Sequence, residues 1–168
     1  MRKGGLIILR DYDSPPMTAS LIMDPKPTVL HPSDTVRTAT QYIMHHRYRN
    51  LPVVDDNGSY IGVFGVHCLM RLMLPPAVVM KEGLTTIPFI RETLSDLHRR
   101  LIEVEDGPIS QCINEVVTVV EPDTPLLETL LVLYKTRTSV PVVDKASGCL
   151  VGMISYWDVT RKILAAEV

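Results

Sequence analysis

Residues 51–64 read LPVVDDNGSYIGVF, and residues 140–154 read VPVVDKASGCLVGMI. Both stretches contain a Pro-Val-Val-Asp segment, then a turn-forming segment with glycine, then a second apolar segment. The prolines Pro52 and Pro141 lie 89 residues apart, and the glycines Gly62 and Gly152 lie 90 residues apart. A period this long indicates that one supersecondary unit occurs twice in the chain.

The segments before these stretches repeat as well. Thr28–Pro32 and Thr118–Pro122 each predict a short strand that ends at a proline, because proline cannot donate to a sheet ladder. A helix follows in both copies, after possible capping oxygens on Ser33–Thr35 and Asp123–Thr124. The second of these helices, over 126–134, is apolar on nearly all sides, which predicts that it is buried on more than one face.

The first of these helices is amphipathic instead, since Val36, Ala39 and Ile43 fall on one stripe at helical spacing. After each Pro-Val-Val-Asp strand the turn residues predict a hairpin, most strongly at Asn57-Gly58. A last helix closes each copy. The unit is therefore β-α-β-β-α, and the helix that joins its first two strands predicts that these two strands are parallel. Each unit has only about fifty residues, too few for a comfortable core of its own, so we expect the two units to pack together.

The element order, the string Leu-Pro-Val-Val-Asp-x-x-Gly-x-x-x-Gly and the tetrapeptide Ser155–Asp158 resemble a tandem pair of cystathionine β-synthase (CBS) domains, known as a Bateman module. The resemblance covers about residues 17–73 and 108–166, which is most of the chain. It implies an α/β (α+β) fold in which two β-α-β-β-α repeats pack with pseudo-two-fold symmetry.

On this basis we divide the chain into an N-terminal arm (1–16), a first CBS domain (17–74), a helical insert (75–107) and a second CBS domain (108–168). In the insert, Ile90, Leu94, Leu97 and Leu101 recur at the spacing of an amphipathic helix. This helix has two interpretations: it packs between the copies and bridges them, or it offers a docking surface for a partner.

Composition excludes several classes of protein. A net charge of −2 and a pI of about 6.2 give no basic face for nucleic acid. The apolar run Leu6–Leu9 is too short for a signal peptide core or a membrane span, so we expect a strand or an extended arm there, without membrane insertion. Three cysteines without close pairs favour reduced thiols and hence the cytoplasm.

The tetrapeptide Ser155–Asp158 has two interpretations that can hold at once. Ser-x-x-Asp before an apolar helix is a capping box, and its acid also suits the helix dipole. A helix N-terminus is equally a place for phosphate oxygens, and a carboxylate can accept both hydroxyls of a ribose. In the CBS family this Ser/Thr-x-x-Asp position is the ribose contact, which implies that Asp158 binds a nucleoside.

The resemblance implies further ligand contacts in the second copy. Thr118 is expected near the sugar and base, and Val140 and Ile154 are expected to hold an adenine. Arg137 suits a phosphate because of its planar fork, although a solvated helix end is an equal alternative. The full predicted ligand-binding set is Thr118, Arg137, Thr138, Ser139, Val140, Pro141, Ile154, Ser155 and Asp158. Arg47 and Arg49 of the first copy reach the same cleft if the copies pack face to face.

The first copy departs from the motif, since it reads Gly65-Val66-His67-Cys68 where the second has Ser155–Asp158. Without a hydroxyl or a carboxylate, this site is predicted to be empty or to bind its ligand differently, which leaves one ligand per chain. His45-His46 has the wrong spacing for a metal site on a helix. A Cys68 nucleophile would need a basic contact in space, so we favour a buried thiol instead.

We therefore predict a regulatory module without catalytic residues, cofactor or metal. It would bind an adenine nucleotide or adenosyl compound (AMP, ADP, ATP or S-adenosylmethionine) in the cleft between the repeats. The resemblance implies a homodimer with helices at its interface, which the apolar 126–134 helix would fit, and Trp157 is either a packing residue or part of the dimer face. Because we expect no catalytic domain, the output would act on a separate partner, such as an enzyme or a transporter. The alternative is an interaction module with no small-molecule ligand, in which Ser155 and Asp158 only cap a helix.

Overall fold

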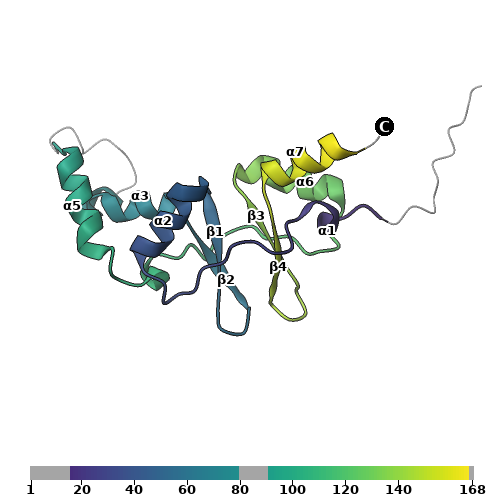
Figure 1. Ribbon diagram of the computed structural model, residues 1–168, viewed down its shortest axis with the longest axis horizontal. Coiled ribbons are helices and arrows are strands. Elements are labelled where there is room, and N and C mark those ends of the chain that lie inside the picture. The colour runs from purple at the N-terminus through teal and green to yellow at the C-terminus, as the bar shows by residue number, and fades with distance from the viewer. Residues whose placement is uncertain (1–15, 80–90, 167–168) are drawn as a thin grey trace, which may run out of the picture.

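The computed structural model describes residues 16–79 and 91–166 (Figure 1). The predicted N-terminal strand at Leu6–Leu9 and the first residue of the predicted insert helix, Ile90, lie outside the described residues. The first copy contains α1 (Ala19–Ile22), α2 (Val36–His46), β1 (Asn50–Val54), β2 (Tyr60–Gly65) and α3 (Val66–Met73). The insert contains α4 (Pro76–Val79) and α5 (Leu94–Val104), and the second copy contains η2 (Ile109–Gln111), α6 (Leu126–Thr136), β3 (Val140–Val143), β4 (Leu150–Ile154) and α7 (Tyr156–Ala165).

Each copy is built around one antiparallel hairpin, β1–β2 in the first and β3–β4 in the second. The two hairpins lie next to each other with their turns at the same edge of the molecule (Figure 1). The predicted strands 28–32 and 118–122 shrink to single bridging residues, Leu30 beside Val53 and Val120 beside Val142. Both bridges are parallel, which confirms the predicted crossover.

The leading segment of each copy pairs with the sheet of the other copy. Asp24 exchanges two backbone hydrogen bonds with Met153 of β4, at 2.8 and 3.0 Å. Asn114 exchanges two with Val63 of β2, at 2.9 and 3.0 Å. The two cores show the same exchange, because Ala19 and Ile22 lie in the second core and Ile109 and Cys112 lie in the first. Each of the two cores therefore includes a short segment that belongs to the other copy in the sequence.

The repeated glycines are explained by this exchange. A Cβ atom on Gly62 would lie 2.6 Å from the carbonyl oxygen of Asn114. A Cβ atom on Gly152 would lie 2.9 Å from the carbonyl oxygen of Asp24 and 2.6 Å from Sδ of Met23. Only glycine lets the backbone of the exchanged segment come this close to the strand.

The long helices partly follow the predictions. In α2 the residues Val36, Ala39 and Ile43 are buried, and the Thr35 side chain caps the helix by accepting from the amide of Thr38, both as predicted. The predicted cap of α6 is wrong, because the hydroxyl of Thr124 accepts from the amide of Glu121 instead.

The predicted burial of α6 on several faces is also wrong within one chain. Thr129 and Leu133 are buried, whereas Leu127, Leu131 and Tyr134 are 80%, 49% and 74% exposed. The three exposed residues are spaced i, i+4 and i+7, so they share one face of the helix. We call this face the α6 stripe.

The insert helix α5 packs on the first copy. It starts with a capping box in which Thr93 and Asp96 bond each other's backbone amides, and hydrogen bonds from Thr93 hold the pKa of Asp96 below its ordinary value. Arg100 donates to the Met73 carbonyl at the end of α3, and Leu101 packs against the first core. Figure 1 shows α5 at the outer end of the first copy, so the predicted bridge between the copies is wrong.

The exchange makes a prediction about stability. Ile109 is fully buried in the first core although it belongs to the second copy, so Ile109→Ala should lower the free energy of unfolding by about 2–5 kcal/mol. Val116→Ala, at a nearby residue that is 93% exposed, should change it by less than about 0.5 kcal/mol. Urea unfolding followed by circular dichroism measures both, and equal effects would contradict the exchange.

Candidate ligand site between the two copies

The N-terminus of α7 is organised by the predicted capping box. The Ser155 hydroxyl oxygen accepts from the Asp158 amide at 3.3 Å, and the Ser155 amide donates to Oδ2 of Asp158 at 2.9 Å. The Ser155 hydroxyl donates to the same Oδ2 atom. The second carboxylate oxygen, Oδ1, takes no part in the cap and lies 3.6 Å from the guanidinium of Arg161. One oxygen of Asp158 therefore completes the helix cap, and the other lies outside the cap beside Arg161.

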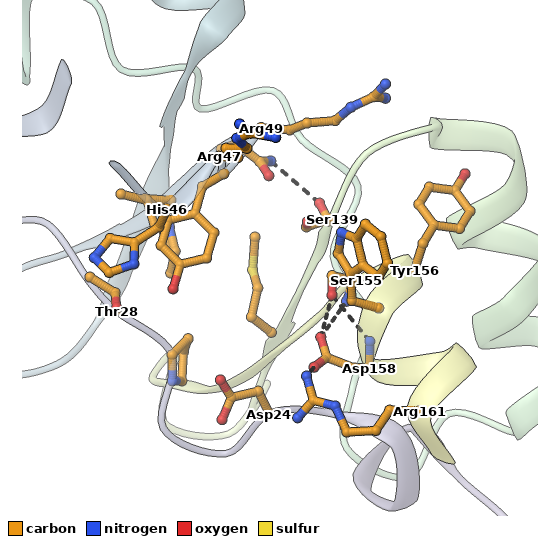
Figure 2. Close-up of a pocket in the computed structure, with 17 residues that line it drawn as sticks. Asp24, Thr28, His46, Arg47, Arg49, Ser139, Ser155, Tyr156, Asp158 and Arg161 are labelled. Atoms are coloured by element: carbon orange, nitrogen blue, oxygen red, sulfur yellow. Dashed lines mark hydrogen bonds and ion pairs between the residues drawn. The ribbon is translucent and has the colours of Figure 1, made fainter. Parts of the chain in front are cut away.

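Asp158 lies in the wall of a cavity of about 560 Å³ between the two copies (Figure 2). Cavities of roughly 300–1,000 Å³ are the usual size for small-molecule sites. Residues of both copies form the wall: Asp24, Pro27, Thr28, His46, Arg47, Tyr48, Arg49, Asn50, Leu51, Pro52, Ser139, Met153, Ser155, Tyr156, Trp157, Asp158 and Arg161. In Figure 2, His46 and Arg47 lie on one side and Ser155 and Asp158 on the other.

The first-copy wall is the segment that leads from α2 into β1. Arg47 ends α2 with a φ of 55°, in the left-handed region, and Arg137 ends α6 with a φ of 56°. A side chain in this conformation costs roughly 1–2 kcal/mol relative to a right-handed backbone. The same strained turn therefore occurs in both copies, but only the Arg47 turn lines this cavity.

The cavity combines positive charge with aromatic rings. Three arginines, Arg47, Arg49 and Arg161, and two carboxylates, Asp24 and Asp158, line it. Three of the nine Phe, Trp and Tyr residues of the sequence also line it, namely Tyr48, Tyr156 and Trp157. Such a wall suits a planar base beside an anionic group, since arginine binds phosphate and aromatic faces stack on bases.

The aromatic residues are held in different ways. The His46 ring stacks on Tyr48 with centroids 5.3 Å apart, and the Tyr156 hydroxyl donates to the Leu133 carbonyl at 2.8 Å. Trp157 is 79% exposed, so it is not a packing residue within one chain, and its other interpretation, as part of a dimer face, stays a prediction. It lies at the cavity with most of its indole surface in solvent.

Three of the nine predicted ligand-binding residues line this cavity: Ser139, Ser155 and Asp158. The structure also brings Arg47 and Arg49 there, which confirms the prediction that they reach the same cleft. It does not bring the other six to this cavity. Val140, Pro141 and Ile154 are buried with the second core, and Thr118, Arg137 and Thr138 lie outside the lining.

The physical reason is the packing of the two copies. The start of α7 in the second copy faces the segment before β1 in the first copy, whereas only Ser139 of the matching segment in its own copy lines the cavity. The lining therefore contains Thr28 where we predicted Thr118. It also contains both Ser139 and Asn50, which occupies the equivalent position in the first copy. Sequence reasoning missed Asp24, Thr28, Tyr48, Asn50 and Arg161. Thr28 occupies in the first copy the position that Thr118 occupies in the second, so the repeat itself could have predicted Thr28.

The first copy holds no equivalent of the Asp158 site. Gly65 stands where the second copy has Ser155, and a Cβ atom there would collide with the carbonyl oxygen of Arg49. Cys68 stands in the place of Asp158 and is buried in the first core. Neither residue can accept hydrogen bonds from a diol, because Gly65 has no side chain and the thiol of Cys68 is buried.

Within the described ranges 16–79 and 91–166, no group of three or more His, Cys, Asp and Glu side chains is placed to hold a metal ion. Two of the three thiols, those of Cys68 and Cys112, are poorly placed for nucleophilic chemistry. Cys68 and Cys112 are both buried, and burial, with a smaller contribution from the charge of Cys68, raises the pKa of the Cys112 thiol to about 11. A protonated, enclosed thiol reacts slowly.

Thiol reactivity tests this arrangement. In the folded protein at pH 8, Ellman's reagent should modify Cys149 quickly, because it is partly exposed, and should reach Cys68 and Cys112 only after unfolding. The free energy of unfolding should also fall as the pH rises from about 9 toward 11, because the Cys112 thiol ionises first in the unfolded chain. A Cys149→Ser variant that still reacts quickly would contradict the burial of the other two thiols.

The comparisons with known proteins show the family of the chain and its fold. A family model described as "CBS domain" matches the chain twice, over residues 19–75 and 109–165. These matches cover more than half of the chain, which therefore belongs to the CBS domain family and carries two CBS domains in tandem. Among the described residues, none of the helices has the length and hydropathy to cross a membrane.

Individual relatives are distant. The chain is 24% identical over 139 residues to CBSX2, a chloroplastic CBS domain-containing protein of Arabidopsis thaliana, and the match covers 81% of this chain and 58% of CBSX2. The structure of CBSX2 in complex with AMP matches with a TM-score of 0.64, covering 88% of this chain and 96% of that one. The CBS pair of protein MJ0100, in complex with 5′-methylthioadenosine and S-adenosyl-L-methionine, is 17% identical and matches with a TM-score of 0.58, covering 91% and 100%. These likenesses establish the fold.

Proposed function

We propose that this protein is a regulatory module that binds an adenosine-containing ligand in the cavity between its two CBS domains. One observation carries the proposal: Asp158 lies in the wall of that cavity and keeps Oδ1 outside the capping box. The solved CBS pairs with AMP and with S-adenosyl-L-methionine support the ligand class, since both compounds contain adenosine.

In this proposal the ribose lies at the N-terminus of α7. Oδ1 of Asp158 accepts from a ribose hydroxyl, and the Ser155 hydroxyl stands beside it. In the free protein the guanidinium of Arg161 lies 3.6 Å from Oδ1 of Asp158. When the ligand binds, Arg161 either moves away from Oδ1 or stays and contacts the ligand as well. The base packs along the aromatic wall, where Tyr48 and Trp157 present ring surface.

Regulation follows from the position of the cavity. Its wall contains residues of both copies, so a ligand that prefers one relative arrangement of the copies shifts the protein toward it. We propose no catalytic role, a separate enzyme or transporter as the target, and the cytoplasm as the compartment. The thiols that the fold leaves unpaired agree with a reducing environment.

The two capping boxes of the chain give a matched test. Asp158→Ala and Asp96→Ala each remove the acid of a capping box, so both should lower stability by a similar amount, about 0.5–2 kcal/mol. Only Asp158→Ala should weaken binding of AMP, by about tenfold or more, because only Asp158 lines the cavity. Fluorescence of Trp157, the single tryptophan of the chain, and calorimetry both report the binding.

The alternative of a ligand-free interaction module gives a different outcome. If AMP, ADP, ATP and S-adenosylmethionine all fail to bind below about millimolar concentration, and Asp158→Ala changes only the stability, then Ser155 and Asp158 are a helix cap and nothing more. Equal loss of AMP binding in both aspartate variants would show an indirect effect of stability.

We also propose that two copies of the protein form a homodimer through the α6 stripe. Leu127, Leu131 and Tyr134 present a continuous apolar face, and in Figure 1 α6 and α7 lie on the outer side of the second copy. Covering such a face removes apolar surface from water, which favours association.

Charge in the stripe should prevent this association. We expect Leu127→Glu combined with Leu131→Glu to give a monomer in sedimentation velocity, whereas the wild type gives a dimer. Leu94→Glu is the matched control, because Leu94 is 84% exposed at the start of α5, far from the stripe. A monomeric wild type would rule out the dimer without affecting the proposed ligand site.

A further inference from the structure

In the first copy, the insert helix α5 covers the end of α3. Leu72 and Met73 of α3 and Leu101 of α5 all pack against the first core, and Figure 1 shows the two helices side by side. Arg100 of α5 donates to the Met73 carbonyl oxygen in the last turn of α3, at 3.1 Å. The insert therefore shields apolar side chains of α3 and also bonds one of its terminal carbonyls.

The matching helix of the second copy, α7, has no such cover within residues 16–79 and 91–166. From Gly62 and Gly152 onward, matching residues lie 90 positions apart, so Met73 corresponds to Ile163 and Leu74 to Leu164. Met73 and Leu74 are partly buried, whereas Ile163 and Leu164 are 63% and 81% exposed. We call the surface formed by Ile163 and Leu164 the α7 end face.

The path of the chain shows which segment lies nearest to this face. In the first copy α5 leads into Gly107, whose carbonyl oxygen accepts from the Val36 amide. In the second copy the carbonyl oxygen of Met17 accepts from the Leu126 amide, which is the same contact displaced by 90 residues at both ends. Residues 1–16 therefore join the second copy at the point where α5 joins the first.

The sequence of this arm suits the α7 end face. Leu6–Leu9 is the longest apolar run of residues 1–16. Leu9 lies eight residues before Met17, a reach of roughly 26 Å when extended, and the ten residues of α7 span only about 15 Å. Arg10 lies 90 positions before Arg100, so an arginine again matches the partner of the helix-end carbonyl. Arginine near the last turn of a helix bonds its free carbonyls and suits its dipole.

The connection through Met17 also favours the arm over a second copy of the protein. A segment tied to the body by a few residues has an effective concentration in the millimolar range, whereas a second molecule has to be recruited from solution. Covering the face then removes apolar surface from water without the cost of association.

We propose that Leu6–Leu9 cover the α7 end face of their own chain, with Arg10 donating to the Ile163 carbonyl oxygen. The arm thus holds α7 in the second copy as α5 holds α3 in the first. This is an interaction within one chain that does not depend on the proposed function.

Cross-linking tests which chain covers the face. In a Cys149→Ser background, where Cys68 and Cys112 are buried, each residue of Leu6–Leu9 is changed singly to cysteine and combined with Ile163→Cys. A short bismaleimide should join the two new thiols within one chain in at least one of these variants, which mass spectrometry of the monomer and of its linked peptides detects. The same arm variants combined with Leu94→Cys, at a residue that is 84% exposed on α5, should give no such link.

Hydrogen exchange tests whether the arm stabilises α7. Ile7→Glu combined with Ile8→Glu should speed exchange of the amides in the last turn of α7 by about tenfold, because charge in the run prevents its burial. Gly4→Glu combined with Gly5→Glu adds the same charge outside the run and should leave this exchange at its wild-type rate.

Three results would overturn the inference. Links that form only between two chains would assign the α7 end face to a second copy. Absence of any link within a chain, at all positions of the run, would show that the arm lies elsewhere. Exchange in α7 that Ile7→Glu with Ile8→Glu leaves unchanged would show that the arm does not stabilise the helix.

Discussion

Each sheet of this protein is completed by backbone from the other copy. Asn114 bonds to β2 and Asp24 bonds to β4, and both contacts require a glycine on the strand that receives the segment. This reciprocal exchange ties the copies together through backbone hydrogen bonds and through the two cores, which also share the exchanged residues. A single copy would leave a sheet edge unpaired and its core partly open, so the tandem arrangement is a requirement of the fold.

The cavity between the copies is a consequence of that exchange. The chain that leaves the second sheet at Asp24 passes Thr28 on its way into the first copy, and this passage forms one wall of the cavity. The start of α7 forms the opposite wall, where the capping box fixes Ser155 and Asp158. The cap holds the first carboxylate oxygen of Asp158 in place, so the ligand contact that we propose for the second oxygen needs little rearrangement of the side chain.

The two copies share a backbone plan but differ in chemistry. Both end their first long helix with an arginine in the left-handed conformation. Only the second copy has room for a serine at the start of its last helix, since Gly65 in the first copy faces the Arg49 carbonyl.

The sequence by itself determined the duplication, the β-α-β-β-α order, the parallel crossover and the capping box at Ser155, because each has a local signature in spacing, turn residues or periodicity. It did not determine which copy faces Asp158. That depends on contacts such as Asp24 with Met153, between residues more than a hundred positions apart, which leave no local pattern. Only the tertiary structure therefore decided that Thr28, Tyr48 and Asn50 line the cavity and that Thr118 and Val140 do not.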